Sequence, residues 1–593
     1  MCGIVGYVGG RNAGEVVLHG LRRLEYRGYD SCGIASVHGG RVEVRKDTGM
    51  LDEIEARLRL SGVRGTTAIG HTRWATHGGV TRENAHPHLD CTRRVAVVHN
   101  GIISNHEELR RELEARGHRF LSETDTEVLP HLIEEHLDSL PLEEAVLRAL
   151  ERVEGSYALL AISALEPGKI VAARNESPLV IGVGEGEMFV ASDVFPFLRY
   201  TRRAVPLEDG EVAVITREGY RVVDRRGAPV SKRELRVDWS DEEARKEGYP
   251  HFMLKEIHEQ PSAVGAALRI YPEDIAKLAE MIQRAERVYL AGAGTSLHAA
   301  MVGEYWFSQL AGKCVIAIDS SELENKAVVD PSTLVVGITQ SGETYDTLAA
   351  LRFARAKGAA TAAIVNVIGS TATRIAEHVV MQGSGIEIAV CATKTYTSQL
   401  TLLLRTAVEL ARMEGRGTEE VEEGMRALPA LLSKVLELED EIARVAEGFF
   451  DVRNYIFMGR GINYPTALEA ALKLKEISYL HAEGMSSGLL KHGTISLIDE
   501  NMHTVAFVPP GGSNRRRVVS NIQEVRARGG RVLAVCSGEP VQGDACIALE
   551  EVHELLTPLL FAPAFQLIAY HVALRLGRNV DRPRALAKSV TVE

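Results

Sequence analysis

Arg287-Val-Tyr-Leu-Ala-Gly-Ala-Gly-Thr-Ser296 and Asn454-Tyr-Ile-Phe-Met-Gly-Arg-Gly-Ile-Asn463 share one pattern, an apolar strand that ends in Gly-x-Gly and leads into a helix. Around the first copy, apolar segments with many β-branched residues alternate with helical ones. The expected strands are Val288–Ala291, Val315–Ile318, Leu334–Ile338 and Ala362–Val367. This alternation is typical of a doubly wound parallel sheet. The repeat predicts two α/β lobes, with ligand loops at the carboxyl ends of their strands.

The chain before Trp239 has a different pattern, with short strands, loops and few helices. The expected strands are Gly3–Val8, Thr67–Ile69, Val95–His99, Tyr157–Ile162 and Val212–Thr216. The polar, acidic stretch Trp239–Lys246, followed by Gly248-Tyr-Pro250, is the best candidate for a linker. We therefore expect a domain over residues 2–238, a linker over 239–248, lobes over 249–420 and 421–583, and a C-terminal tail over 584–593.

Composition excludes several classes of protein. The 593 residues are 45% hydrophobic and 25% charged, with a net charge of −12, so no basic surface for nucleic acid is expected. No run of about eighteen apolar residues predicts a membrane span, and no signal peptide is recognised at the N-terminus. Seven scattered cysteines without a CxxC pair favour a reducing, cytoplasmic location and argue against structural zinc. His86-Pro-His88 is interpreted as a structural pair of histidines.

The N-terminus, Met1-Cys-Gly3, carries a candidate nucleophile. A small second residue permits removal of Met1, which would leave Cys2 with a free α-amino group. Such an amine has a pKa of roughly 7.7–8.0 and accepts a proton near neutral pH. A thiol and a base on one residue are suited to nucleophilic catalysis.

Three further motifs fit an amino acid with a cleavable amide. His71-Thr-Arg-Trp-Ala-Thr-His-Gly78 offers a guanidinium for a carboxylate. His99-Asn-Gly-Ile102 offers an amide and a backbone N–H for an oxyanion. Thr124-Asp-Thr-Glu127 offers an acid for an ammonium group.

Together with Arg27-Gly-Tyr-Asp-Ser31, these motifs resemble the class II, N-terminal-nucleophile glutamine amidotransferases, strongly over residues 2–130 and more loosely to 238. The resemblance implies a four-layer α/β/β/α sandwich that binds L-glutamine. It implies that Cys2 is the nucleophile, that Asn100 and Gly101 form the oxyanion hole, that Arg73 and Asp125 clamp glutamine, and that Trp74, Thr76 and His77 line or gate the pocket.

The Gly-x-Gly loop of the first lobe does not match the standard nucleotide motifs, because Leu297 replaces the third glycine of GxGxxG and no Walker lysine follows. Asp319 at the end of the next strand keeps dinucleotide binding as an alternative. Thr295 and Ser296 place hydroxyls at a helix N-terminus, which suits a phosphate monoester. The hydroxyl-rich Thr339-Gln-Ser-Gly-Glu-Thr344 follows another strand and could cap a helix, bind phosphate, or both.

Glu469, Lys473 and Glu476 have the spacing of one helix face. A solvated ladder of salt bridges is the simpler interpretation. The apolar residues between them favour a buried helix instead, in which such groups transfer protons.

The second half, with Ala392-Thr-Lys-Thr-Tyr-Thr397, Ala471-Leu-Lys-Leu-Lys-Glu-Ile-Ser-Tyr479, Leu490-Lys-His-Gly493 and Leu586-Ala-Lys-Ser-Val-Thr-Val-Glu593, resembles the glucosamine-6-phosphate synthase family, which has two sugar-isomerase (SIS) lobes. The resemblance implies transfer of nitrogen from L-glutamine to D-fructose 6-phosphate. It implies that Ser296, Thr339, Gln340, Ser341 and Thr344 hold the phosphate, with Thr295 beside them. Further implied roles are Glu476 as base, Lys473 at the sugar oxygens, His492 in ring opening from the partner of a homodimer, Lys588 at the ketose carbonyl, and backbone contacts from Val390 and Ala587.

This chain departs from that family's usual pattern at a few positions. Thr339 replaces a serine and keeps the hydroxyl, whereas Cys391-Ala392 loses one hydroxyl. Leu489 and Thr494 replace an acid and a proline around His492. The tail that carries Lys588 is expected to be ordered. The implied chemistry needs no metal or organic cofactor, since acid, base and amine groups suffice.

Three other classes of protein fit the sequence less well. A phosphoribosyl-diphosphate amidotransferase would need an acidic pair at the end of a strand, followed by a hydroxyl-rich loop, and an asparagine synthetase would need Ser-Gly-Gly-x-Asp-Ser; neither is found in this chain. A sugar-phosphate-sensing SIS regulator would carry a DNA-binding helix-turn-helix, which the acidic charge disfavours.

Overall fold

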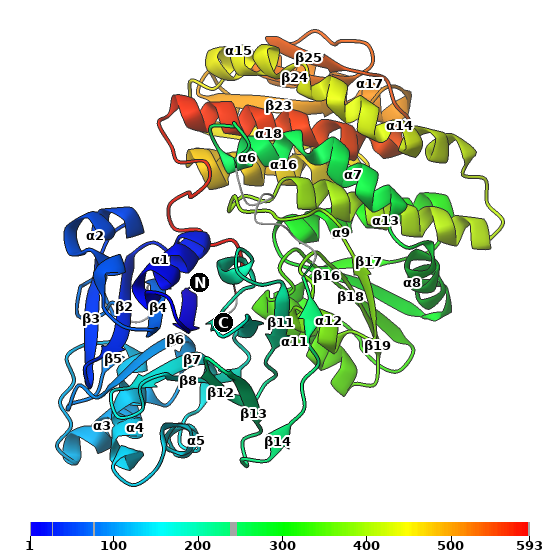
Figure 1. Ribbon diagram of the computed structural model, residues 1–593. Helices are drawn as coiled ribbons and strands as arrows, with labels where there is room; N and C mark the ends of the chain where they lie inside the picture. The colour runs from blue at the N-terminus through cyan, green and yellow to red at the C-terminus, as the bar shows by residue number, and fades with distance from the viewer. Residues whose placement is uncertain (1, 26–27, 75–77, 238–245, 591–593) are drawn as a thin grey trace. The chain divides into compact units, whose positions relative to one another are not determined.

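The computed structural model describes residues 2–25, 28–74, 78–237 and 246–590 (Figure 1). The chain divides into two compact units, one of Met1–Ala244 with Ala587–Glu593 and one of Arg245–Leu586. Thr76, His77 and most of the expected linker lie outside the described residues.

The first unit contains two sheets of antiparallel pairs. One sheet has the order β15 (Leu235–Arg236), β11 (Arg203–Pro206), β9 (Val180–Val183), β10 (Met188–Ala191), β1 (Gly3–Val8), β4 (Thr67–Arg73), β2 (Ser31–His38), β3 (Arg41–Thr48). The other has the order β14 (Pro229–Val230), β13 (Gly219–Val223), β12 (Val212–Thr216), β8 (Lys169–Asn175), β7 (Gly155–Ser163), β6 (Val95–Ile103), β5 (His88–Leu89).

Helices cover the outer faces of these sheets. They are α1 (Ala13–Leu24) and α2 (Leu51–Leu58) on the first sheet, and α3 (His106–Ala115), α4 (Val128–Leu137) and α5 (Leu142–Leu150) on the second. Every residue of β1 is buried because its two faces pack on different layers. Ile4 and Val8 join the core between the sheets, while Val5 packs against Gly20 of α1. The four-layer α/β/β/α sandwich is confirmed.

The strand expected over Thr67–Ile69 continues to Arg73. Its polar end, His71-Thr-Arg73, lacks the apolar pattern from which a strand is recognised in sequence. Pairing with β1 and β2 on both sides nevertheless holds it extended, with Thr72 opposite Gly3 and Arg73 opposite Ser31.

The second unit contains two parallel sheets with the same topology. Their orders are β17 (Ile316–Asp319), β16 (Arg287–Gly292), β18 (Thr333–Thr339), β19 (Ala360–Val365), β20 (His378–Met381), and β22 (His481–Ser486), β21 (Asn454–Gly459), β23 (Met502–Val508), β24 (Val532–Ser537), β25 (Ala545–Leu549). In each sheet the second strand in sequence lies at the edge and the first lies beside it. This shared order, with β16 and β21 at equivalent places, supports an internal duplication.

Helices join and cover these sheets (Figure 1). They are α6 (Phe252–His258), α7 (Gln260–Arg269), α8 (Pro272–Arg284), α9 (Thr295–Trp306), α10 (Leu323–Lys326), α11 (Tyr345–Ala356), α12 (Thr371–Ile375), α13 (Lys394–Met413), α14 (Glu419–Leu436), α15 (Glu439–Phe449), α16 (Asn463–Ser478), α17 (Gly512–Arg526) and α18 (Thr557–Arg575). One apolar cluster runs through both lobes, and α16 packs against α9 and α18 within it.

Among the described residues, Glu554–Arg575 is the one helical stretch long and apolar enough to cross a membrane, with a mean hydropathy of 1.5. It lies in the protein core, because 94% of its apolar window is buried by the rest of the fold. A core helix of an α/β protein has this composition, since it is covered on all sides.

Candidate functional site

The Cys2 thiol lies against the backbone of Trp74. The Trp74 N–H donates to Sγ at 3.1 Å, and the thiol donates to the Trp74 carbonyl at 3.4 Å. Burial raises the pKa of the Cys2 thiol, against lowering contributions from the Trp74 N–H and the Arg73 guanidinium. The thiol is therefore the resting form, and a base is needed to produce the nucleophilic thiolate.

Asn100 is oriented by His71. The His71 Nε2 lies 3.0 Å from both the Asn100 Oδ1 and the His99 carbonyl oxygen. Both partners accept, so Nε2 carries the proton. Burial lowers the pKa of His71 to about 3, which keeps the imidazole neutral. The Asn100 amide nitrogen then points at Cys2 and donates to its carbonyl at 2.9 Å.

Gly101 follows Asn100 with a φ of 126°. A β-carbon at this position would lie 2.1 Å from the Ser156 carbonyl oxygen, so only glycine fits. The close approach of β6 and β7 thus fixes the backbone beside Asn100.

Arg73 and Asp125 lie in the same neighbourhood. Arg73 is 3% exposed, donates to the carbonyls of Gly78 and Gly79, and interacts electrostatically with Cys2 and Asp125. Asp125 accepts a hydrogen bond from the Ile103 N–H at 2.8 Å. Trp74 is partly buried and its ring packs edge-on to Tyr29. The structure thus brings together Cys2 and five further predicted residues of the glutamine pocket, with the Arg73 cation interacting with both the thiol and the Asp125 carboxylate.

The two hydroxyl-rich loops of the second unit follow adjacent parallel strands, β16 and β18. Thr295 and Ser296 begin α9, and Gly292 has no room for a β-carbon, which would approach the Ser296 backbone to 2.8 Å. In the other loop Thr339 ends β18, its hydroxyl lies 3.1 Å from that of Thr344, and it accepts from the Gly342 N–H at 3.2 Å.

The same loop leaves Gln340 partly exposed, while the Ser341 hydroxyl accepts from the Glu343 N–H at 3.1 Å. Asp319, the residue that kept dinucleotide binding open, accepts from the Ser321 N–H and caps a 3₁₀ turn. Its carboxylate is therefore engaged by its own loop.

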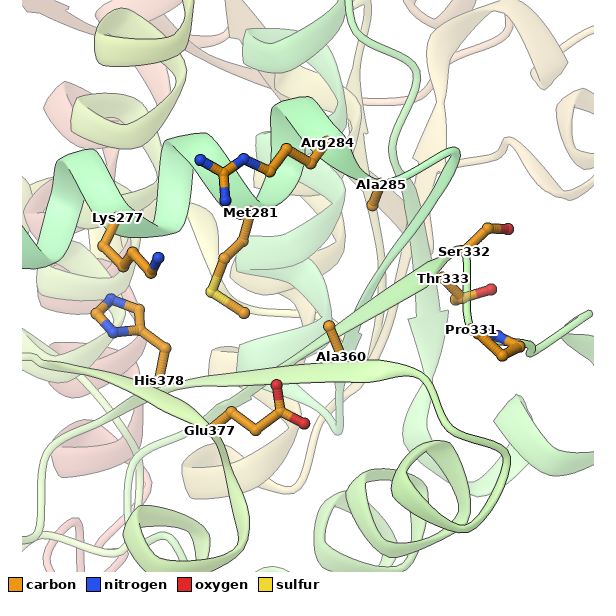
Figure 2. Close-up of a pocket in the computed structure, with 10 residues that line it drawn as sticks. All are labelled: Lys277, Met281, Arg284, Ala285, Pro331, Ser332, Thr333, Ala360, Glu377 and His378. Atoms are coloured by element: carbon orange, nitrogen blue, oxygen red, sulfur yellow. The ribbon is translucent and has the colours of Figure 1, made fainter.

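A surface pocket of about 380 Å³ lies at the amino ends of the strands in the same sheet (Figure 2). It is lined by Thr333, Ala360 and His378, the first residues of β18, β19 and β20, and by Lys277 and Met281 of α8. Ligands of parallel α/β sheets bind at the carboxyl ends of the strands. The hydroxyl loops lie at the carboxyl ends of the strands, where a ligand is expected, and this pocket does not.

Glu469, Lys473 and Glu476 form a buried ladder on α16. The Lys473 Nζ lies 3.3 Å from Glu469 and 2.7 Å from Glu476, and donates to the Thr295 hydroxyl at 2.9 Å. Glu469 and Lys473 are fully buried, whereas the Glu476 side chain is 21% exposed. The interpretation as a solvated ladder is wrong, because α9 and α18 cover this helix.

The charges of this ladder stabilise one another. Burial opposes ionisation of Glu469, but Lys473 and the hydrogen bonds from His298 and Thr295 outweigh it and lower its pKa. Burial likewise opposes the charge on Lys473, but the surrounding anionic groups outweigh it and hold its pKa well above the usual value. Lys473 is therefore a fixed cation beside the Thr295 hydroxyl, and Glu476 is the partly accessible carboxylate.

The remaining predicted residues lie outside this ladder. The Val390 N–H donates to the Asp581 carbonyl at 3.1 Å. His492 is exposed on the turn between Ser487–Leu489 and Thr494–Leu497. Ala587 and Lys588 belong to the first unit, so their roles at a sugar in the second unit stay predictions.

Three residues at these sites had no role predicted from the sequence, and a fourth, Glu469, has a partner that its helix spacing suggested only in general terms. His71 orients Asn100, His298 binds Glu469 at 2.7 Å, the Cys391 thiol donates to Glu476 at 3.0 Å, and Glu469 holds Lys473. Cys391 is one of the departures from the usual family pattern, and it replaces a lost hydroxyl with a thiol donor. His71 and Glu469 stood in the quoted motifs, but the partners of His298 and Cys391 are distant in sequence.

Two family models match different parts of the chain. A glutamine amidotransferase domain matches residues 71–199, and a SIS domain matches twice, at 281–408 and 448–576. A solved structure, the C-terminal domain of glucosamine-fructose-6-phosphate aminotransferase from Francisella tularensis, is 36% identical, with a TM-score of 0.54, over 57% of this chain and 99% of that chain.

Relatives match over the full length. Proteins named glutamine–fructose-6-phosphate aminotransferase [isomerizing] from Methanococcus maripaludis and Thermococcus kodakarensis are each 48% identical, and one from Thermus thermophilus is 47% identical. Each match covers 100% of this chain and 100% of the relative. The chain belongs to the family of isomerizing glutamine–fructose-6-phosphate aminotransferases.

Proposed function

We propose that this enzyme transfers the amide nitrogen of L-glutamine to D-fructose 6-phosphate and isomerises the product, which gives D-glucosamine 6-phosphate and L-glutamate. One observation carries the proposal. A chain that is similar over its whole length to the named aminotransferases holds a thiol beside Arg73, which also interacts with Asp125, and a buried Glu–Lys–Glu ladder beside a hydroxyl loop.

In the first half-reaction, we assign the attack on the glutamine amide carbon to the Cys2 sulfur. The α-amine of Cys2, free after removal of Met1, takes the thiol proton and passes it to the departing ammonia. The Asn100 amide donates one hydrogen to the Cys2 carbonyl, which leaves its second hydrogen and the Gly101 N–H for the oxyanion. Water then hydrolyses the thioester to glutamate. Arg73 and Asp125 would bind the α-carboxylate and α-ammonium groups, and Trp74, Thr76 and His77 would line or gate this pocket.

In the second half-reaction, we place the phosphate of the sugar on Thr295, Ser296, Thr339, Gln340, Ser341 and Thr344. A phosphate at this position would meet the N-terminus of α9, whose dipole favours an anion. The Lys473 ammonium, 2.9 Å from the Thr295 hydroxyl, supports an anion on that side. Val390 and Ala587 would contact the sugar through their backbones.

The proton transfer between C1 and C2 is assigned to Glu476. Its carboxylate is partly exposed while Lys473 and Cys391 hold it in place. Lys588 would form the imine with the open ketose carbonyl, and His492 would assist ring opening from the partner subunit of a homodimer. Support for a subunit contact there comes from Leu489 and Leu497, which flank His492 and are 55% and 53% exposed.

The reaction is tested with amide-labelled glutamine and fructose 6-phosphate in excess unlabelled ammonium, with the product resolved by mass. We expect glucosamine 6-phosphate that carries the label, because the liberated ammonia would not mix with solvent. Hydrolysis of glutamine without any aminated sugar would refute the proposal. Unlabelled product alone would refute protected transfer.

The shared site is tested by mixing His492→Ala and Lys588→Ala chains. If His492 acts across the dimer, subunit exchange creates a site with both residues intact, and synthesis returns. A mixture that stays inactive after proven exchange would refute this arrangement.

The seven cysteines are all free, which fits action in a reducing cytoplasm.

A further inference from the structure

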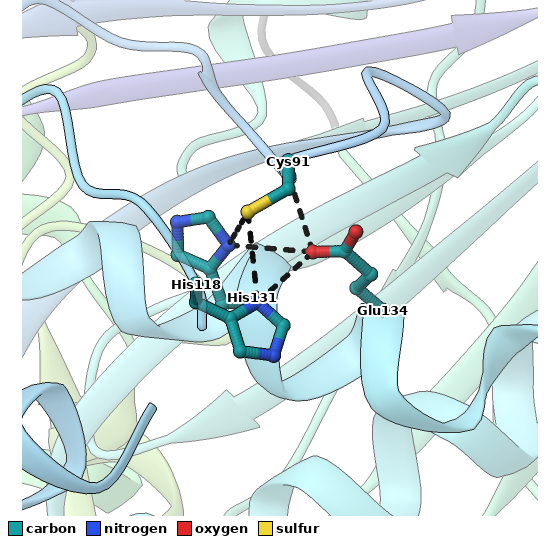
Figure 3. A group of neighbouring side chains, drawn as sticks. All are labelled: Cys91, His118, His131 and Glu134. Atoms are coloured by element: carbon teal, nitrogen blue, oxygen red, sulfur yellow. Dashed lines mark hydrogen bonds and ion pairs between the residues drawn. The ribbon is translucent and has the colours of Figure 1, made fainter. Parts of the chain in front are cut away.

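Four potential metal ligands converge on the first unit, on the side of the second sheet covered by α3 and α4 (Figure 3). They are Cys91 after β5, His118 after α3, and His131 and Glu134 on α4. One atom from each, Sγ, two Nδ1 and a carboxylate oxygen, all lie within 4.8 Å of one another.

The separations fit a tetrahedral metal. Cys91 Sγ lies 3.7 Å from the His118 Nδ1 and 3.6 Å from the His131 Nδ1, and the Glu134 Oε2 lies 3.2 and 3.4 Å from these two nitrogens. Zinc bonds of about 2.0–2.3 Å give tetrahedron edges of roughly 3.4–3.6 Å. Four of the six separations among these atoms are thus close to tetrahedral edges, and the other two are no longer than 4.8 Å.

The two ring nitrogens of the cluster converge on one carboxylate oxygen. Both imidazoles aim the same nitrogen at one carboxylate oxygen, which also accepts from the Cys91 N–H at 3.1 Å. Hydrogen bonding to this oxygen would require a proton on both Nδ1 atoms, in rings whose centroids lie 5.1 Å apart. A divalent cation would instead take a lone pair from each ring nitrogen.

The surroundings also suit a metal. The side chains of His118, His131 and Glu134 are 14%, 1% and 11% exposed, while Cys91 is exposed, so an ion could enter past it. The Arg119 N–H lies 3.4 Å from Cys91 Sγ, as expected for a thiolate ligand.

Each imidazole has a carboxylate behind its other nitrogen. The His118 Nε2 lies 3.8 Å from Glu135, and the His131 Nε2 lies 3.8 Å from Glu127. At 3.8 Å these carboxylates are too far for hydrogen bonds, but their negative charge favours a cation bound to the rings.

We propose that Cys91, His118, His131 and Glu134 bind a structural Zn²⁺ ion. Thiolate, two imidazoles and a carboxylate are ligands that zinc accepts, and four protein ligands close a tetrahedral site. The ion ties the β5–β6 loop and the segment after α3 to α4. Because α4 follows directly on Asp125–Glu127, the same ion steadies the segment that carries Asp125.

The wide spacing of these ligands in the sequence does not predict a metal site, and none was expected from the sequence. Cys91 is 27 residues from His118 and 40 from His131, and no CxxC pair is present. The sole local signal is His131-x-x-Glu134, two ligands on one helix face.

The proposal is tested first by metal analysis of the purified full chain. We expect one zinc per chain, retained in Cys314→Ser and lost in Cys91→Ser and His131→Gln. Cys314 is the matched control, since it is an exposed cysteine outside the cluster. Zinc that stays at the wild-type level in both cluster variants would overturn the assignment.

Cobalt titration of metal-free wild-type protein needs no variant to fold. Tetrahedral Co²⁺ with a thiolate ligand gives strong visible bands and a sulfur-to-metal charge-transfer band. We expect both, with the charge-transfer band absent from Cys91→Ser and present in Cys314→Ser. Added Zn²⁺ should also raise the Tm of the metal-free protein, because a ligand of the native state stabilises it. Metal-free wild type that takes up neither ion would overturn the proposal.

Discussion

The Nζ atom of Lys473 lies 2.7 Å from the carboxylate of Glu476, one turn along the same helix. Glu469, one turn in the other direction, lies 3.3 Å from the same ammonium and is fully buried. Three charges in a protein interior are tolerated only when each has a partner, because desolvation is costly. The ion pair with Lys473 therefore holds the carboxylate of Glu476 in place.

Replacing the lysine of this ladder should destabilise the second unit. We expect Lys473→Met to cost about 3–5 kcal/mol, because it leaves buried carboxylates without their counter-ion. The measurement is the urea midpoint of the transition that reports the parallel-sheet unit. The variant should also lose sugar isomerisation while glutamine hydrolysis persists.

The control for this prediction is the pair Lys473→Met with Glu469→Gln. Residues of one charge network are not independent, so the double variant should be more stable than the sum of the single losses predicts. Additive losses would show that the two side chains do not stabilise each other.

Cys2→Ala should abolish glutamine hydrolysis, with a fall of at least about 10³-fold, because it removes the nucleophile. Isomerisation of fructose 6-phosphate should remain, since that chemistry is assigned to Glu476, Lys473 and Lys588 and does not use the Cys2 thiol. The matched control is Cys32→Ala, a buried cysteine of β2 in the same unit. Equal glutaminase rates in wild type and Cys2→Ala would be incompatible with the assigned nucleophile.

Gly101→Ala should lower glutaminase kcat by about 10²–10³-fold, because its β-carbon forces the oxyanion-hole backbone away from Ser156. Gly10→Ala is the comparison, since a β-carbon there meets nothing within 4 Å. Steady-state glutamine hydrolysis measures the effect, and circular dichroism checks that both variants fold. A Gly101→Ala enzyme with unchanged kcat would exclude this backbone from the site.

The stability of the first unit should fall in acid through its buried histidines. Burial lowers the pKa of His71 to about 3, against about 6.5 in an unfolded chain. As pH falls below about 6.5, the unfolded state binds a proton that the native state refuses, so native stability decreases until the folded pKa is reached. Each such histidine contributes up to about 1.4 kcal/mol per pH unit.

The check is the urea midpoint of the first unit at pH 7 and at about pH 4.5. The loss between the two should be smaller in His71→Gln than in wild type, and unchanged in His38→Gln, an exposed position on β2. Identical pH dependence in wild type and His71→Gln would mean that His71 is not held neutral by the fold.

The sequence by itself determined the class of the fold and the identity of most candidate residues. Strand after strand of apolar residues, the repeated Gly-x-Gly at β16 and β21, and the short motifs around Cys2, Arg73 and Asn100 are local features, and local features follow from residue type and spacing. For the same reason the period of the sequence predicts the ladder on α16, whereas its burial follows from α9 and α18, which cover the helix.

The tertiary structure alone decided which side chains meet across the chain. Cys391 reaches Glu476 over 85 residues and His298 reaches Glu469 over 171, and Cys91 joins His118, His131 and Glu134 from separate elements. A periodic pattern encodes which face of a helix or strand is buried, but not which other element covers it. That choice depends on strand order and helix packing over the whole unit, so these contacts exist only once the sheets have formed.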